Sequence, residues 1–314
     1  MIIDAHLHIT NGFQGLTGAG RTESLELGMV RQGDQIHQVL PPINPGKTVF
    51  PPETLIQFMD WVGIDKAVLL QGSFYGDQNQ YLYETCQRWP DRFLPAAFLD
   101  PHANDVRDQF RKVTNEYGFR ILKFEMSQPT GFTGVYPDLR LDGPEMSWIW
   151  EAAEQQELVI TLDLGKGRTP AYQTREVQTL IQRHPSLVVV IAHLAQPPLE
   201  KQGDQELNDL WEKQILLGKN ANVWFDMSAL PAYQDEEYPF ASALRYIRRA
   251  VDLIGAERLM WGSDIPGLLG HATYKQLLDS VCRHAGFSES ALPGILGETA
   301  WKIYGPRESG AHES

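Results

Sequence analysis

Short apolar runs alternate with amphipathic stretches along nearly the whole chain. Eight runs rich in apolar and β-branched residues predict strands at residues 1–5, 67–71, 93–98, 121–124, 159–162, 188–192, 223–227 and 259–261. Most lack the in–out alternation of a half-solvated sheet. The run Val188-Val189-Val190-Ile191 is typical of a strand buried on both faces, as strands of parallel sheets are.

Helical spacing of apolar residues fills most of the intervals. The predicted helices cover residues 52–62, 78–89, 106–117, 145–156, 171–183, 239–254 and 274–285. Eight strands that alternate with helices predict an α/β fold, a (β/α)8 TIM barrel. An open doubly wound sheet is the alternative, but no glycine-rich phosphate-binding sequence follows the first strand.

The pattern predicts one barrel domain over residues 1–306 and a frayed tail at 307–314. Residues 10–51 form a long loop excursion after strand one, rich in glycine and proline. Within the excursion, Gly33-Asp34 is typical of a hairpin turn between residues 29–32 and 35–39. Barrel enzymes place lids and substrate loops at this position.

Composition and charge narrow the classes of partner. The 314 residues carry a formal net charge of −13, so nucleic acid and acidic membrane surfaces are not expected partners. Two cysteines are too few for a disulfide scaffold. Without a signal peptide or an apolar run of about 20 residues, a cytoplasmic protein is expected. Barrel helices on the surface often form dimers, so a homodimer is the alternative to a monomer.

Polar residues stand where four of the predicted strands end. His6 and His8 close strand one, and alternate residues of a strand share a face, so two imidazoles can grip one divalent ion. Asp163 follows strand five, His193 ends strand six, and Asp264 follows strand eight. Each has an ordinary structural explanation, such as a cap, a turn or a buried histidine. Their joint position at the catalytic end of a barrel favours an active site.

Other side chains at this end are candidate substrate contacts. Lys123 and Glu125 share one face of strand four, where an internal ion pair is the structural alternative for the lysine. Arg168, on the loop after strand five, can clamp a carboxylate and therefore suggests an anionic small-molecule substrate. Phe74 and Tyr75, just past strand two, are candidates for the pocket wall.

With these motifs in order along the chain, the sequence resembles the amidohydrolase superfamily, in the amidohydrolase-related branch of single-metal hydrolases and non-oxidative decarboxylases. The motifs are the HxH of strand one, AHLAQP at 192–197 and GSDIP at 262–266. The matching segments are residues 3–8, 68–100, 137–165, 184–197, 222–229, 255–266 and 295–305. The resemblance implies a distorted TIM barrel with a divalent metal at the carboxyl ends of its strands.

The resemblance also implies residue roles. His6 and His8 match metal ligands, His193 matches the histidine that activates substrate, and Asp264 matches an aspartate that is both ligand and proton-transfer group. Most relatives have histidine where this chain has Asp163. The third ligand is therefore either Asp163 or Glu125. One zinc ion is expected, with manganese as the alternative because of the extra oxygen ligand.

The expected function is metal-dependent hydrolysis of a lactone, ester or amide carbonyl in a small carboxylated substrate. Non-oxidative decarboxylation of an aromatic or muconate-like acid is the alternative, because the same residues serve both reactions. A two-metal centre, bridged at Lys123 or Glu125 as in two-metal relatives, stays open. So does a barrel that has lost its metal and serves as a binding protein.

Overall fold

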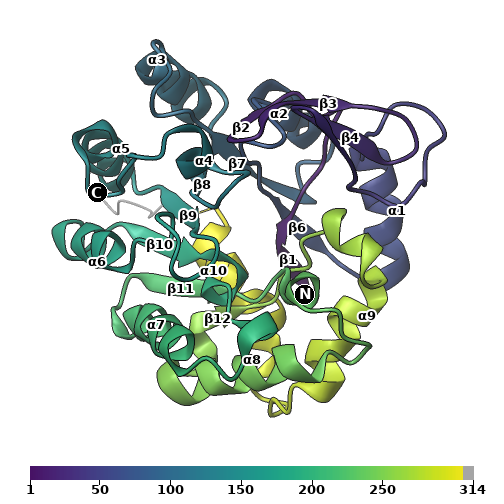
Figure 1. Cartoon of the computed structure of the whole chain (residues 1–314), viewed down its shortest axis with the longest axis vertical. Coiled ribbons are helices and arrows are strands. Elements are labelled where there is room, and N and C mark those ends of the chain that lie inside the picture. Colours follow the sequence, from purple (N-terminus) through teal and green to yellow (C-terminus); the bar gives the residue numbers. More distant parts are fainter. Residues whose placement is uncertain (307–314) are drawn as a thin grey trace, which may run out of the picture.

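The computed structural model, which describes residues 1–306, is a parallel eight-stranded barrel surrounded by helices (Figure 1). The strands neighbour one another in the order β1-β6-β7-β8-β9-β10-β11-β12, which is their order along the chain. This confirms the predicted (β/α)8 fold. The barrel strands are β1 (Ile3–Leu7), β6 (Lys66–Leu69), β7 (Phe93–Phe98), β8 (Ile121–Glu125), β9 (Val159–Asp163), β10 (Val188–Ile191), β11 (Val223–Asp226) and β12 (Leu259–Met260).

Backbone hydrogen bonds between β1 and the segment after β12 close the barrel. The amide of Ala5 donates to the carbonyl of Trp261 at 3.0 Å, and the amide of Asp264 donates to the carbonyl of His6 at 2.7 Å. The amide of His8 donates to the carbonyl of Ile265 at 2.8 Å. The first and last strands therefore bring Asp264 close to His6 and His8, although more than 250 residues separate it from both histidines along the chain.

Helices cover the outside of the barrel in Figure 1. Helix α1 begins at Pro52 and ends before Gly63, whose φ of 88° suits glycine. Three helices, α4, α7 and α10, lie outside the predicted set. The helices are α1 (Pro52–Val62), α2 (Asn79–Arg88), α3 (Val106–Arg111), α4 (Phe132–Val135), α5 (Pro144–Gln155), α6 (Thr174–Arg183), α7 (Gln205–Ile215), α8 (Ala241–Ile254), α9 (Tyr274–Asp279) and α10 (Thr299–Tyr304).

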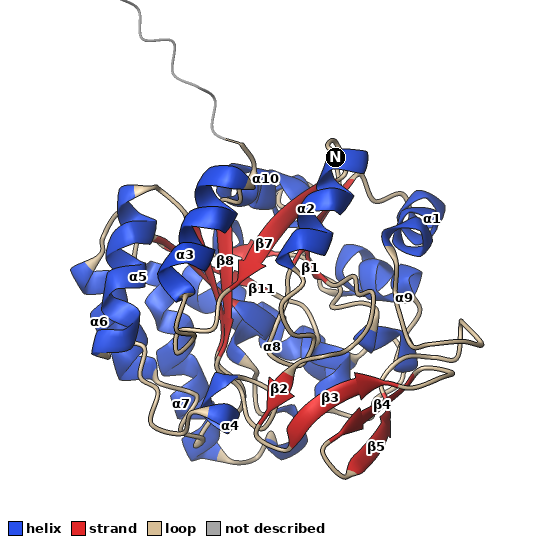
Figure 2. Cartoon of the chain, turned by 90° about the horizontal axis from the view of Figure 1, so that it is seen from above, coloured by secondary structure: helices blue, strands red, loops and turns tan. Residues whose placement is uncertain are grey.

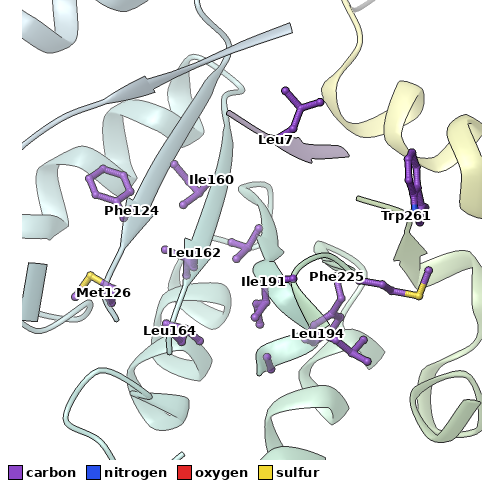
Figure 3. Close-up of a cluster of buried hydrophobic side chains, with 14 of the residues drawn as sticks. Leu7, Phe124, Met126, Ile160, Leu162, Leu164, Ile191, Leu194, Phe225 and Trp261 are labelled. Carbon is purple, nitrogen blue, oxygen red and sulfur yellow. The ribbon is translucent and has the colours of Figure 1, made fainter. Parts of the chain in front are cut away.

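Two apolar layers hold the barrel together. The larger lies between strands and helices, and Figure 3 shows some of its members, among them Phe124, Ile160 and Phe225. The smaller fills the barrel interior with side chains from all eight strands, and α10 closes it with Ala300, Ile303 and Tyr304. Because α10 closes one end, polar side chains gather at the opposite, carboxyl end of the strands.

A β-bulge in β1 aims the two histidines. The pairing with β6 shifts between Asp4 and Leu7, so the chain gains one residue against its neighbour. Ile3 and Ala5 pack in the barrel interior, whereas Leu7 packs in the outer layer. Before the bulge the odd-numbered residues of β1 face the barrel interior, and after it the even-numbered residues do. His6 and His8 therefore face inward, above Ala5.

The excursion at 10–51 is a small antiparallel sheet rather than an irregular loop. It contains β2 (Leu16–Thr17), β3 (Gly20–Ser24), β4 (Met29–Gln32) and β5 (Gln35–Gln38), and the predicted hairpin joins β4 to β5. Figure 2 shows this sheet at the end of the molecule opposite α10. The hydroxyl of Thr22 donates to the carbonyl of Phe74, so the sheet packs on the loop after β6.

The predicted tail at 307–314 lies outside the described residues. No helix within residues 1–306 is long and apolar enough to cross a membrane. Both cysteines, Cys86 and Cys282, are free thiols.

Candidate metal and catalytic centre

The polar residues at the strand ends converge in the barrel mouth. One ligand atom each from His6, His193 and Asp264 lies within 4.8 Å of the others. The side chain of His8 joins them, with its Nε2 2.9 Å from Asp264 Oδ1. The structure therefore brings together all four residues that the strand-end pattern and the resemblance place in one site.

Each β1 imidazole is oriented through its Nδ1 atom. The Nδ1 of His6 lies 3.0 Å from Asp226 Oδ2, and the Nδ1 of His8 lies 2.7 Å from the carbonyl of Leu70. Both partners are acceptors, so each Nδ1 donates a proton and each Nε2 is left to face the barrel mouth. Burial lowers the pKa of His6 to about 4, which keeps this imidazole neutral.

His193 is fixed in a similar way. Its Nδ1 lies 2.8 Å from the hydroxyl of Ser228, which donates its own proton to Asp226. The backbone amide of His193 also donates to Asp226, at 3.0 Å. Asp226 thus orients both His6 and His193, and the Nε2 of His193 faces Asp163 Oδ2 at 3.5 Å.

A strained backbone turn presents His193. The four residues His193, Leu194, Ala195 and Gln196 have φ between 45° and 57°, a left-handed conformation that costs about 1–2 kcal/mol for each non-glycine residue. Two buried side chains stabilise it. The hydroxyl of Tyr172 donates to the carbonyl of Ala195 at 3.0 Å, and the indole of Trp211 donates to the carbonyl of Leu194 at 2.8 Å.

We expect Tyr172→Phe to lower kcat about 5- to 20-fold while leaving the fold intact. The change removes only the hydroxyl that holds the left-handed turn, a loss of about 1–2 kcal/mol. His193 then samples positions away from the reacting atoms. Steady-state kinetics and the ring resonances of His193 in NMR spectra check this. Tyr246→Phe removes another tyrosine hydroxyl bond, to Asn208 Oδ1 on the outer helices, and serves as the matched control.

The two carboxylates in the mouth are held ionised. Burial would raise the pKa of Asp264, but the hydrogen bond to His8 and the charge of His193 bring it well below its usual range. Burial would also raise the pKa of Asp163, and the charges of His193 and Lys123 lower it to about 2. Burial lowers the pKa of His193, yet the charge of Asp163 raises it to about 9.

This donor set suits a cation. The Nε2 of His8 and an oxygen of Asp264 lie 2.9 Å apart, close enough for the two atoms to bind one shared proton or one metal ion. The Nε2 of His6 lies 3.8 Å from the same Oδ1. Neutral imidazoles and a carboxylate are the ligands that zinc prefers. The residues present therefore fit a divalent metal ion.

Lys123 and Glu125 project into the same interior. The ammonium of Lys123 lies 3.2 Å from the Nε2 of His6. Glu125 Oε1 accepts hydrogen bonds from the hydroxyls of Ser127 and Thr130, at 2.9 and 2.7 Å. The other oxygen, Oε2, packs on Gly72, where a Cβ would lie only 1.9 Å away. Asp163, Glu125 and also His8 are not among the three residues whose ligand atoms lie within 4.8 Å of one another. Asp163 faces His193 instead, and Glu125 faces Gly72.

Comparison with known proteins agrees with this geometry. The sequence model of the Amidohydrolase family matches residues 3–305. The chain belongs to the amidohydrolase family. It is thus an enzyme of the amidohydrolase superfamily, as its HxH, AHLAQP and GSDIP motifs predicted.

Two relatives of this amidohydrolase have names that describe a reaction. An L-fucono-1,5-lactonase from Burkholderia ambifaria is 24% identical over 228 residues, which cover 71% of this chain and 72% of the relative. A probable 2-pyrone-4,6-dicarboxylic acid hydrolase from Acinetobacter baumannii superposes with a TM-score of 0.68 at 16% identity, over 97% of this chain and 99% of that one.

A third relative was solved with a metal. An amidohydrolase from Burkholderia multivorans with bound zinc superposes with a TM-score of 0.70 at 19% identity, over 98% of this chain and the whole of that one. At 16% and 19% identity, the similarity to the Acinetobacter baumannii and Burkholderia multivorans structures establishes the shared fold.

The predicted substrate contacts fall in two places in this amidohydrolase. The ring of Tyr75 stacks on His8 with 4.8 Å between centroids, and Phe74 lies next to it in the loop after β6. The guanidinium of Arg168 instead binds both oxygens of Asp204 and also contacts Glu206. Its charge is already balanced at the surface.

Asp226 is the central residue that the sequence interpretation missed. It ends β11 just as Asp163 ends β9, so the strand-end rule that selected Asp163 could have found it. Its side chain is fully buried and lies behind the imidazoles, so it acts through His6 and His193.

We expect Asp226→Asn to weaken zinc binding about 10- to 100-fold, because outer partners of ligating histidines have effects of this size. An amide nitrogen in place of one oxygen would oppose a donor, either the Nδ1 of His6 or the amide of His193. Competition titration with a chromophoric chelator measures the change. An unchanged zinc affinity would contradict the orienting role of Asp226.

Proposed function

We propose that this amidohydrolase is a metal-dependent lactonase that opens the ring of a small-molecule lactone. The observation that carries the proposal is the pair of inward Nε2 atoms of His6 and His8 beside the ionised Asp264. The similarity to a lactonase over 71% of the chain supports the lactone as the bond that is cleaved.

His6, His8 and Asp264 would hold one divalent ion, with zinc proposed and manganese as the alternative. A bound ion of this kind polarises a carbonyl group and makes water more acidic. His193 stays outside the ligand set in this proposal, because its Nε2 faces the carboxylate of Asp163 at 3.5 Å.

The chain's own residues then divide the proton transfers. Asp264, ionised at neutral pH, accepts a proton from the water whose oxygen attacks the lactone carbonyl carbon. His193, protonated beside Asp163, donates to the oxygen on which negative charge develops. When the ring C–O bond breaks, the leaving oxygen receives a proton, and the product is a hydroxy acid.

Metal content and ring opening test this proposal together. We expect close to one zinc per chain in protein purified without chelator, and more than tenfold loss of lactone hydrolysis after chelation, restored by zinc. A pH indicator follows the acid that ring opening releases. Full activity in chelated protein would refute the metal requirement, and two ions per chain would instead implicate Lys123 or Glu125 as a bridge.

The decarboxylase alternative uses the same residues and is separated by its product. Carbon dioxide release from hydroxylated aromatic acids, with no turnover of any lactone, would replace the lactonase proposal.

A further inference from the structure

A cavity of about 170 Å³ opens beside the catalytic centre. It lies between the strained turn that presents His193 and the loop after β9, and its inner wall includes Tyr172, Leu207 and Trp211. Pockets for drug-sized ligands measure roughly 300–1,000 Å³. This cavity therefore suits a smaller group, of about the size of one sugar ring.

Two residues connect the cavity to the reacting groups. Tyr233 lines the cavity, and its ring meets His193 edge-on with 6.3 Å between centroids. Gln196 also lines the cavity, and its backbone amide donates to the carbonyl of His193 at 2.8 Å. A ligand that fills the cavity would therefore contact two residues that themselves contact His193, the imidazole proposed as the proton donor.

The hydroxyl of Tyr233 and the side-chain amide of Gln196 have no hydrogen-bond partner among residues 1–306. Together they offer a hydroxyl that donates and accepts, an amide donor and a carbonyl acceptor. Burial, and then the charges of Asp163 and Asp264, raise the pKa of Tyr233 well above its usual range, so its hydroxyl keeps its proton.

The charges of the cavity stand at its rim. Lys166 and Glu200 pair at 3.3 Å, and each side chain is about 60% exposed. Lys201 is exposed as well. The deeper wall, formed by Tyr172, Trp211 and Leu207, is uncharged. A carboxylate placed against that wall would lose its hydration without gaining a charged partner, which is costly.

We propose that this cavity is the subsite for the hydroxyl-bearing part of an uncharged sugar lactone, with Gln196 and Tyr233 as its specificity-determining residues. Aromatic faces suit the C–H surface of a sugar ring, and groups that both donate and accept suit its hydroxyls. The inference rests on the proposed lactonase function and names the substrate class that the site selects. It replaces the carboxylated substrate that the sequence suggested.

Three substrates of equal ring size test the subsite. They are an aldono-1,5-lactone, which is neutral and hydroxylated, δ-valerolactone, which lacks the hydroxyls, and an aldarolactone, which carries an added carboxylate. We expect kcat/KM for the aldonolactone to exceed that for δ-valerolactone at least 100-fold, because a site built to bind hydroxyls discriminates strongly against their absence. The aldarolactone should be no better than the aldonolactone.

Two conservative variants test whether Gln196 and Tyr233 cause the preference for the hydroxylated lactone. Gln196→Leu and Tyr233→Phe should each lower kcat/KM for the aldonolactone about 5- to 20-fold, mainly through KM, as loss of one hydrogen bond predicts. The losses on δ-valerolactone, which lacks these hydroxyls, should be smaller. Gln155→Leu, the same exchange at an exposed position of α5, is the matched control.

The outcomes separate the subsite from the activity. Equal hydrolysis of all three lactones, or equal losses on both neutral substrates in the variants, would overturn the subsite and leave the lactonase proposal standing. A tenfold preference for the aldarolactone would overturn the uncharged class and favour an anion site at Lys166 or Lys201. No turnover of any lactone would instead refute the proposed function itself. Binding can also be tested without turnover, in the Asp264→Asn variant. An aldonolactam should raise the thermal unfolding temperature of this variant, and the rise should be lost in the double variant Gln196→Leu/Asp264→Asn.

Discussion

Asp264→Asn is expected to lower kcat about 10³-fold, within the usual range for loss of a general base. The amide cannot accept a proton from the attacking water. In the wild-type enzyme the hydrogen bond to His8 and the charge of His193 keep this carboxylate ionised against the effect of burial. The substitution therefore removes a group that is in its reactive form at neutral pH.

The structure indicates that this variant folds. Asp264 has a φ of 61°, and asparagine is the residue besides glycine that best tolerates the left-handed region. The amide is also isosteric with the carboxylate, so the bond from the backbone of Asp264 to His6 that closes the barrel can persist. Circular dichroism and thermal unfolding should resemble those of the wild type.

Metal loss must be separated from loss of the base. Kinetics at saturating zinc, with the metal content of each sample measured, separate the two effects. Asp235→Asn, at an exposed position, controls for the change of charge. A variant that keeps more than a tenth of wild-type activity with zinc bound would exclude Asp264 as the base.

Local pattern was enough to predict the barrel. Parallel strands buried on both faces leave continuous apolar runs, and the predicted strand at residues 93–98 and helix at 52–62 agree with β7 and α1 to the residue. The strand-end rule also found His6, His8, Asp163, His193 and Asp264, because chain position alone places a strand end at the barrel mouth.

Features that depend on distant contacts were beyond the sequence. The four-stranded sheet at 10–51 gains its stability from packing on the loop after β6, which its glycine- and proline-rich sequence does not reveal. The bulge in β1 and the left-handed turn at His193 are backbone irregularities without a local signal, since none of the four residues of that turn is glycine. The ion pairs of Arg168 were beyond the sequence for a related reason, because Asp204 and Glu206 lie 36 and 38 residues away along the chain.

His193→Asn is expected to lower kcat about 10²–10³-fold, the usual loss when a donor to a developing oxyanion is removed, while zinc content stays close to one per chain. Asparagine keeps a side-chain group near the position of Nδ1, where it can still bind Ser228, and its residue type suits the φ of 57°. The substitution therefore removes only the Nε2 atom, which is the proposed proton donor. Loss of zinc in this variant would make His193 a ligand and contradict the division of roles proposed here.

The pH dependence of kcat tests the same role of His193 as proton donor without removing its imidazole. The charge of Asp163 raises the pKa of His193 to about 9, so the proton donor is present below that pH and wild-type kcat should fall as pH rises through it. Asp163→Asn removes the charge and leaves burial, which lowers the pKa of His193. The alkaline limb should therefore move to lower pH in Asp163→Asn and be absent in His193→Asn. A limb that stays near pH 9 in both variants would belong to another group and would exclude His193 as the acid.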